Sequence, residues 1–255
     1  MHPSDTPAVT VIPVADHRDG PYGITAGPDG ALWLTFVHSG RIARLTLDGG
    51  LSTYALDSPG CRPTVITPGP DGALWFTRFG DHRVGRVTVD GETSSFPVPT
   101  PDSGPFGITA GPDGALWFTL NQANAVGRIT TSGDVTTYPL PTPGAAPVGI
   151  TGDGTALWFV EIAAGRIGRI SLDGAIQEFP LPDPAARPHA IVAATAGECW
   201  FTEWGANRVG RVTAGGEITE YGLPTPSSEP HGIAVGPDGA LWTALETGAV
   251  ARVGR

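Results

Sequence analysis

One tryptophan recurs along the whole chain at a nearly constant spacing. Consecutive members of the series are 41 or 42 residues apart, and a proline and an arginine recur with them. The six tryptophans are Trp33, Trp75, Trp117, Trp158, Trp200 and Trp242. Self-similarity at a fixed period is the mark of a repeat protein, in which each unit packs mainly against its neighbours. The chain is therefore constrained to stack six similar units.

Each unit predicts strands rather than helices. The consensus P-x-G-I-T-x-G-P-D-G-A-L-W-F-T is followed by a variable stretch and then by R-[IV]-G-R-[IV]-T-x-x-G. It holds four short apolar runs separated by turn residues, and no stretch keeps a helical period. Four strands in such a unit make one blade of a propeller. We expect an all-β, six-bladed β-propeller of four-stranded antiparallel blades, forming one domain over residues 1–255. A β-solenoid or an open array is the alternative.

The two ends of the chain suggest how the ring closes. The last unit stops at AVARVGR, before its fourth apolar run, whereas the run VTVIPV at residues 9–14 precedes the first repeated proline. We expect residues 8–14 to supply the missing strand of the last blade, residues 230–255. Such pairing would remove an exposed sheet edge.

The composition of the chain argues against nucleic acids and membranes as binding partners. The formal net charge of −10 argues against a nucleic-acid partner, and no apolar run is long enough to cross a membrane. The N-terminus lacks the features of a signal peptide. The two cysteines, Cys61 and Cys199, are too few for a disulfide framework, so both are expected to be reduced. We expect a monomeric, cytoplasmic protein with no nucleic-acid or membrane partner.

Equivalent positions can be compared across the six repeats. Residues that follow the consensus are expected to be structural, including the repeated arginines and the aspartates of the turns. Residues that break it are candidates for function. The position after the repeated proline, called here the post-proline position, holds Tyr22, Thr64, Phe106, Val148, His189 and His231.

Four deviations are expected to converge on the last two blades. His231 begins the first strand of blade six and Glu246 ends the second, so the two should share one end of a hairpin. Glu229 lies in the loop that enters the same strand. His189 occupies the post-proline position of blade five, so it should be the neighbour of His231 at the central channel.

Three further residues are placed at the same end. Glu203 and Trp204 follow the second strand of blade five, and Tyr22 opens blade one, which ring closure would place beside blade six. Two imidazoles and two carboxylates can hold a divalent metal ion, or one histidine can act as a general base. Solvated histidines and packing of Trp204 at the rim are the simpler alternatives. Glu161 is expected to be a solvated or channel-lining carboxylate.

Several segments resemble the virginiamycin B lyase family, also called streptogramin B lyases. They are RPHAI, WFTEWGAN, EPHGI and LWTALE in the last third, GPYGI in the first blade, and PVGI with WFVEI in the fourth. The resemblance runs along the whole chain, although the repeat itself is generic. It implies a propeller enzyme that opens the macrocyclic lactone of type B streptogramin antibiotics by elimination rather than by hydrolysis.

The resemblance also implies a cofactor and roles for individual residues. The family uses Mg²⁺, which Glu246, His189 and Glu229 would position. His231 would be the general base, with His189 and Glu229 as further catalytic residues. Tyr22 and Trp204 would bind the substrate, a small macrocyclic lactone.

The number of blades differs from that of the family. Family members have seven blades, whereas this chain has six repeats, and the missing blade is expected to come from the N-terminal half. Two alternatives to the lyase therefore stay open. One is a metal-dependent lactonase, which would add water across the ester, and the other is a propeller that binds a ligand without catalysis.

Overall fold

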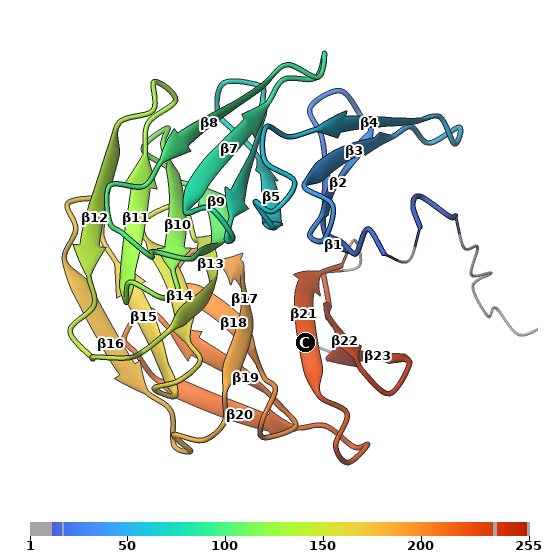
Figure 1. Cartoon of the computed structure of the whole chain (residues 1–255). Helices are drawn as coiled ribbons and strands as arrows, with labels where there is room; N and C mark the ends of the chain where they lie inside the picture. The colour runs from blue at the N-terminus through green and yellow to red at the C-terminus, as the bar shows by residue number, and fades with distance from the viewer. Residues whose placement is uncertain (1–11, 17, 237–238, 254–255) are drawn as a thin grey trace, which may run out of the picture.

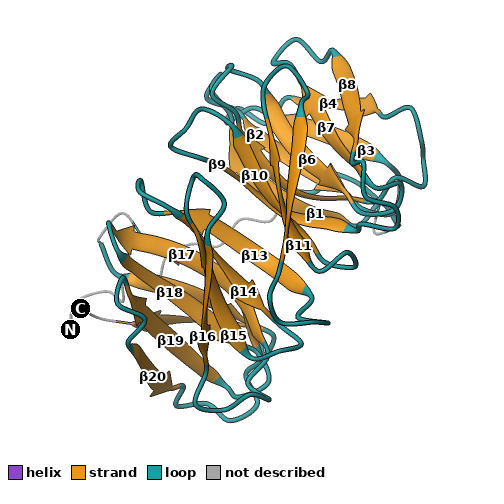
Figure 2. Ribbon diagram, turned by 90° about the vertical axis from the view of Figure 1, so that its left-hand side faces the viewer, coloured by secondary structure: helices purple, strands orange, loops and turns teal. Residues whose placement is uncertain are grey.

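The computed structural model describes residues 12–16, 18–236 and 239–253. All of the regular structure in these ranges is β-strand, and the strands form blades arranged around a common centre (Figure 1). Figure 2 shows the blades side by side from the edge of the ring. Within the described ranges, no helix is long and apolar enough to cross a membrane.

The strands follow the sequence repeat closely. Blades one to three consist of β1 (Pro21–Ala26), β2 (Leu32–Phe36), β3 (Arg41–Leu45), β4 (Leu51–Ala55), β5 (Pro63–Pro68), β6 (Leu74–Arg78), β7 (Arg83–Val87), β8 (Thr93–Pro97), β9 (Pro105–Ala110), β10 (Leu116–Leu120), β11 (Ala125–Ile129) and β12 (Val135–Pro139). Blades four to six consist of β13 (Pro147–Gly152), β14 (Leu157–Glu161), β15 (Arg166–Ile170), β16 (Ile176–Pro180), β17 (Pro188–Thr195), β18 (Glu198–Glu203), β19 (Arg208–Thr213), β20 (Ile218–Gly222), β21 (Pro230–Val235), β22 (Leu241–Leu245) and β23 (Ala249–Val253).

The predicted all-β, six-bladed propeller is confirmed. Each sheet pairs consecutive strands in antiparallel order, with four strands in blades one to five and three in the described part of blade six. The strand predicted to complete blade six lies mostly outside the described residues. Its described part, Ile12–Val14, is not in a strand, and Val14 packs against the apolar cluster of blade one that contains Leu34 and Phe36.

The repeated tryptophan is held by an ionic clamp within its own blade. In blade three, Trp117 Nε1 donates to Asp113 Oδ1 at 3.1 Å, and Arg128 Nε donates to the other carboxylate oxygen at 2.7 Å. The indole is sandwiched between the guanidinium of Arg128 and the ring of Tyr138. The same two hydrogen bonds and a stacked aromatic ring hold the tryptophans of blades one and two. The turn aspartate and the repeated arginine therefore act together on the tryptophan, which gives a physical basis for the structural role predicted for both from the sequence.

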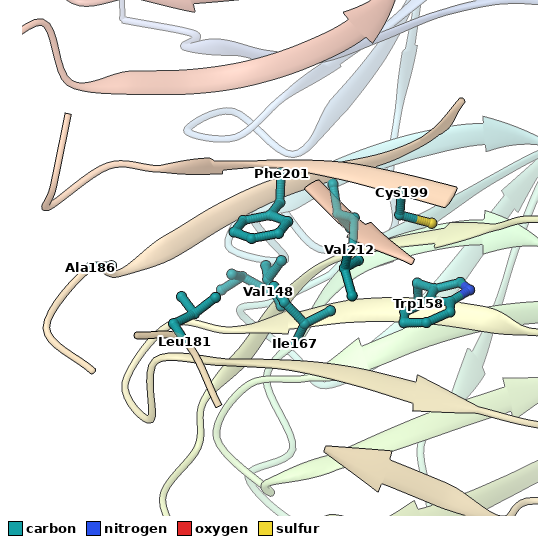
Figure 3. Close-up of a cluster of buried hydrophobic side chains, with 10 residues drawn as sticks. Val148, Trp158, Ile167, Leu181, Ala186, Cys199, Phe201 and Val212 are labelled. Atoms are coloured by element: carbon teal, nitrogen blue, oxygen red, sulfur yellow. The ribbon is translucent and has the colours of Figure 1, made fainter. Parts of the chain in front are cut away.

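Apolar contacts between blades form the core. Figure 3 shows one such cluster, in which Val148, Trp158 and Ile167 of blade four face Phe201 and Val212 of blade five. All of these side chains are buried. The core is thus divided into clusters along the ring, as expected where each repeat contacts only its neighbours.

A repeated threonine hydroxyl joins one blade to the next. Thr119 Oγ1 accepts from Gly107 N of its own blade at 2.9 Å and donates to Val148 O of the following blade at 2.7 Å. Thr35, Thr77 and Thr202 make equivalent bonds, each to the carbonyl of the next post-proline residue. In blade four the position is Val160, so this junction is formed without the hydroxyl.

Replacing one bridging threonine should weaken the ring measurably. Thr119→Val leaves Gly107 N and Val148 O without their partner in a buried site, which should lower the free energy of unfolding by about 1–3 kcal/mol. Denaturant unfolding measures this loss. Valine is sterically compatible, because Val160 occupies the same position in blade four. The exposed Thr136→Val is the control, and an equal change in both variants would contradict a bridging role.

The junction between blades six and one differs from the other five. The inner strands contact one another in order from β1 to β21, and no comparable contact joins β21 to β1 among the described residues. Ile24 is 60% exposed, whereas the equivalent isoleucines of blades two to five are 4–9% exposed. Blade six also has Ala244 at the position of the bridging threonine. The blades therefore run as an arc with blade one and blade six at its two ends (Figure 1), and the expected packing of blade one on blade six is not seen.

Candidate functional site

An irregularity at the start of every blade aims the post-proline side chains inward. The register of the first two strands shifts in each blade between the repeated proline and the isoleucine three residues later. A bulge of this kind bends a strand and redirects its side chains. Gly107 and Gly149 lie within it, where an added Cβ would lie 2.3 and 2.8 Å from the backbone of the following blade. The post-proline residues therefore surround the centre of the ring.

A cavity of about 410 Å³ occupies this centre. It is lined mainly by apolar residues such as Phe106, Val148 and Ile150, and its polar groups are those of Tyr22, His189 and His231. The polar side chains come from the first strands of blades one, five and six. A largely apolar cavity with a few polar groups is the usual form of a small-molecule site.

His231 and Glu246 form a short polar contact beside this cavity. His231 Nε2 lies 2.5 Å from Glu246 Oε1, and the two side chains are 37% and 53% exposed. The predicted meeting of these residues at one end of a hairpin is thus seen in the structure. Thr202 of blade five fixes the backbone of His231, because its hydroxyl donates to His231 O at 2.9 Å.

The loop that carries Glu229 is held from the neighbouring blade. Ser228 is fully buried, and its backbone N donates to Asn207 Oδ1 at 2.8 Å. Glu246 N donates to Ser228 O at 2.9 Å, which ties the end of β22 to the same loop. Glu229 itself has a left-handed backbone, with φ of 46°. This loop brings the carboxyl groups of Glu229 and Glu246 together.

The carboxyl groups of Glu229 and Glu246 are hydrogen-bonded to each other. The hydrogen bond between them, in which Glu246 is the acceptor, raises the pKa of Glu229, and the same bond, together with His231, lowers the pKa of Glu246. The two pKa values therefore shift in opposite directions, and Glu246, the group with the lowered pKa, is the one that faces the imidazole of His231.

His189 lies beside His231 in the same cavity. The two rings meet edge to face, with centroids 4.7 Å apart and an interplanar angle of 80°. Burial, and then the charge of His231, lowers the pKa of His189 to about 4, so His189 is neutral near pH 7. Its Nδ1 is buried without a hydrogen-bond partner among the described residues. A buried polar atom without a partner is expected where a ligand supplies one.

Trp204 flanks these histidines on the blade-five side. Its ring centroid lies 6.1 Å from that of His231, and the guanidinium of Arg187 lies 5.4 Å from its ring. A second cavity of about 480 Å³ is lined by Trp204, Arg187 and Glu229. The seventh tryptophan of the sequence therefore belongs to the surroundings of the histidine pair rather than to the blade core.

Most of the predicted site residues lie together. His189, Glu229, His231, Glu246 and Trp204 form one group on blades five and six. Tyr22 lines the central cavity as well, but its ring packs edge to face on Phe106 of blade three, 6.1 Å away, rather than on blade six. Two sets of neighbours were not predicted: the aromatic neighbour Phe106, and the positioning residues Arg187, Asn207 and Ser228. The sequence shows Phe106 as an aromatic residue at the post-proline position. The roles of the other three residues can be recognised only from the folded conformation of the loops that contain them.

Glu161 and Glu203 are buried, which corrects one prediction. Glu161 was expected to be solvated or to line the channel, yet it is 0% exposed and neither oxygen has a hydrogen-bond partner in the described part of the chain. Burial, and then the nearby Glu178, raises its pKa to about 8. Glu203 is equally buried but is bonded to Arg208 at 2.7 Å. Neither carboxylate belongs to the group around His231.

The buried Glu161 should make stability depend on pH. Its folded pKa of about 8 lies above the ordinary value of 4.5, so the folded state keeps a proton that the unfolded state releases. Stability should therefore be greatest below about pH 4.5 for this group and fall as pH rises towards 8. Glu161→Gln removes the dependence, so the variant should gain melting temperature over the wild type at pH 8 but not at pH 4.5. A constant difference at both pH values, or the same gain in the exposed Glu217→Gln, would refute this assignment.

The donor set fits a hard cation in part. Within the described ranges, no three His, Cys, Asp or Glu side chains are grouped so that they could hold a metal ion. Glu229 and Glu246 nevertheless face each other closely enough to form a hydrogen bond. Mg²⁺ is commonly held by one or two carboxylates, with water and substrate completing its shell. This carboxylate pair is of that kind, and the buried Nδ1 of His189 is a further donor that lacks a partner.

Comparisons of this sequence with known families and with individual relatives find the same family. The sequence model of the virginiamycin B lyase family matches residues 7–119 and 108–253. A virginiamycin B lyase from Saccharopolyspora erythraea is 64% identical over 45 residues, which cover 18% of this chain. That aligned stretch spans only 15% of the relative.

Solved structures extend the likeness over nearly the whole chain. The virginiamycin B lyase of Staphylococcus aureus is 39% identical, with a TM-score of 0.62, over 93% of this chain and 95% of the other. A catalytically inactive variant of that enzyme, in which alanine replaces one histidine, has been solved with quinupristin and is 38% identical, with a TM-score of 0.61, over 94% and 97%. With the family model matching both halves of the repeat array, this chain belongs to the virginiamycin B lyase family.

Proposed function

We propose that the protein is a metal-dependent lyase that linearises type B streptogramins by elimination at their ester bond. The observation that carries the proposal is the pairing of His231 with the ionised Glu246 beside the central cavity. An imidazole oriented by a carboxylate is a common general base. The second histidine, His189, stays neutral beside it and contributes an unpaired ring nitrogen.

The elimination assigns a distinct task to each residue. His231 accepts the α-proton of the threonine-derived residue of the macrocycle, and the electrons of that C–H bond form a carbon–carbon double bond. The Cβ–O bond of the ester breaks at the same time, and the ester oxygen leaves as part of a carboxylate. When Nε2–H of His231 donates to Glu246, Nδ1 is the nitrogen that is free to accept the proton. The negative charge of Glu246 then stabilises the imidazolium that forms.

A metal ion would act on the carbonyl side of the reaction. When bound, Mg²⁺ polarises the lactone carbonyl and stabilises the negative charge that develops on its oxygen. Glu229, Glu246 and His189 are the residues that we propose to hold it. Protons compete with a cation for carboxylate oxygens, so the affinity for Mg²⁺ should fall at low pH.

The surroundings suit a bulky, partly aromatic macrocycle. Of the proposed substrate-binding residues, Tyr22 lines the largely apolar central cavity together with the two histidines, and the ring of Trp204 lies next to that of His231. The solved complex of the inactive relative with quinupristin supports this ligand class. That a single histidine-to-alanine change accompanies inactivity there supports a histidine as the catalytic base.

Mass spectrometry of quinupristin incubated with the protein tests the proposal. The expected product has an unchanged mass, the fragmentation pattern of a linear peptide and new alkene absorbance, because elimination rearranges bonds without adding atoms. The reaction should require Mg²⁺ and stop in EDTA. A product heavier by one water would mean ester hydrolysis, and an intact macrocycle after incubation with Mg²⁺ would refute the lyase.

A further inference from the structure

A second arginine–aromatic stack lies on blade two. Arg62 precedes the repeated proline and Phe79 is the fourth residue after the repeated tryptophan, the same two positions that Arg187 and Trp204 hold on blade five. The guanidinium carbon of Arg62 lies 5.3 Å from the ring centroid of Phe79, against 5.4 Å for the blade-five pair. Blades two and five are three blades apart, so the two stacks lie on different sides of the central cavity.

This stack is not a consequence of the repeat. In the other blades the same two positions hold Gly20 with Val37, Gly104 with Asn121, Ala146 with Ile162, and Glu229 with Glu246. Arg62 and Arg187 also have left-handed backbones, with φ of 49° and 50°. That conformation favours glycine, which blades one and three have there. The two arginines are therefore not explained by the backbone geometry of the loop.

Aromatic contacts connect the blade-two stack to the cavity. The ring of Phe106 meets that of Phe79 edge to face at 6.2 Å and 89°, and that of Tyr22 at 6.1 Å and 88°. Phe106 and Tyr22 also line the cavity shared by His189 and His231. The aromatic wall of the cavity therefore continues through Phe106 to Phe79, whose ring is partly exposed.

We propose that the stack of Arg62 and Phe79, together with Phe106, is a second substrate-binding surface. It takes an aromatic side chain of the macrocycle on the side of the cavity away from the blade-five tryptophan. Aromatic faces bind aromatic rings by stacking, and an adjacent guanidinium adds a cation–π contact. Holding the macrocycle at two separated points orients its ester over His231. This inference rests on the proposed lyase function and identifies how that site selects its substrate.

Two substitutions at Phe79 test the surface directly. Phe79→Leu removes the ring and keeps the apolar bulk, so it should raise the KM for quinupristin about tenfold, or about 1.4 kcal/mol of binding free energy. Phe79→Tyr keeps the ring and should restore the wild-type KM. Arg62→Ala, at an exposed position, should raise KM in the same direction. Ile162→Ala truncates an apolar side chain at the equivalent position of blade four and is the control, for which KM should not change.

Calorimetric titration of quinupristin separates this inference from the proposed function. Wild-type protein that binds quinupristin without linearising it would refute the lyase, while weaker binding by Phe79→Leu would still support the surface. Phe79→Leu and Arg62→Ala variants that both bind and react like the wild type would overturn the surface and leave the lyase standing. Failure of the wild type to bind would overturn both.

Discussion

His231→Ala should lower kcat for quinupristin by about 10³-fold while leaving the fold intact. A positioned general base contributes about 10²–10⁴-fold to a proton transfer, and here the same change also removes the partner of Glu246. The imidazole is partly exposed rather than part of a blade core, so its removal creates no buried cavity. Single-turnover kinetics measures the chemical step, and thermal melting verifies that the blades remain assembled.

A matched histidine controls for the loss of an imidazole in general. His82 lies on blade two, where its Nδ1 accepts from Gly104 N at 3.2 Å, and it does not line the central cavity. His82→Ala should therefore keep wild-type turnover. Wild-type activity in both the His231 and the His82 variant would exclude His231 from the reaction. An equal loss in both would point to a general effect on folding.

The architecture could be predicted because every blade repeats the same local signals. The period, the turn residues and the apolar alternation each specify a strand without reference to distant parts of the chain. The junction of blades six and one could not be predicted in this way. It depends on whether two ends of a long array meet, and the relevant signals are isolated, such as Ala244 in place of the bridging threonine and the exposed Ile24.

The residues of the candidate site could be predicted from the sequence for a related reason. Comparing equivalent positions across six repeats isolates residues that packing does not require, and the hairpin register then places His231 opposite Glu246. What that comparison could not supply is burial. Glu161 and Glu246 are both deviations at the end of a second strand, yet one is fully buried and the other is half exposed. The difference arises from neighbouring loops and outer strands, which carry no signal at those positions.

The sequence also could not separate an aromatic residue that binds substrate from one that packs. Phe79 and Trp204 occupy equivalent positions, and only the folded chain reveals that each carries an arginine on its face. The clamp of Asp113 and Arg128 on Trp117 illustrates the same limit. Its three members are recognisable in the sequence as repeated residues. Their hydrogen bonds, however, depend on the directions of side chains that come from a loop and two neighbouring strands.

Glu246→Gln should reduce kcat by about 10²-fold or more, with a smaller effect on KM. The amide can still accept a hydrogen bond from His231 Nε2, so the orientation of the ring in the ground state is kept. What is lost is the negative charge, which matters most once the imidazole has taken the α-proton and become cationic. An interaction that is stronger in the transition state than in the ground state is expressed in kcat.

Titrating Mg²⁺ against the Glu246→Gln variant then distinguishes the two roles proposed for this carboxylate. If Glu246 also holds the metal, the Mg²⁺ concentration for half-maximal activity should rise together with the fall in kcat, because one of two facing carboxylates has lost its charge. If kcat falls while the Mg²⁺ response is unchanged, Glu246 acts only on His231 and the metal is held elsewhere. Glu217→Gln, at an exposed turn of blade five, should alter neither quantity. A Glu246 variant that behaves like this control would exclude the carboxylate from the site, and the pairing with His231 would then be structural.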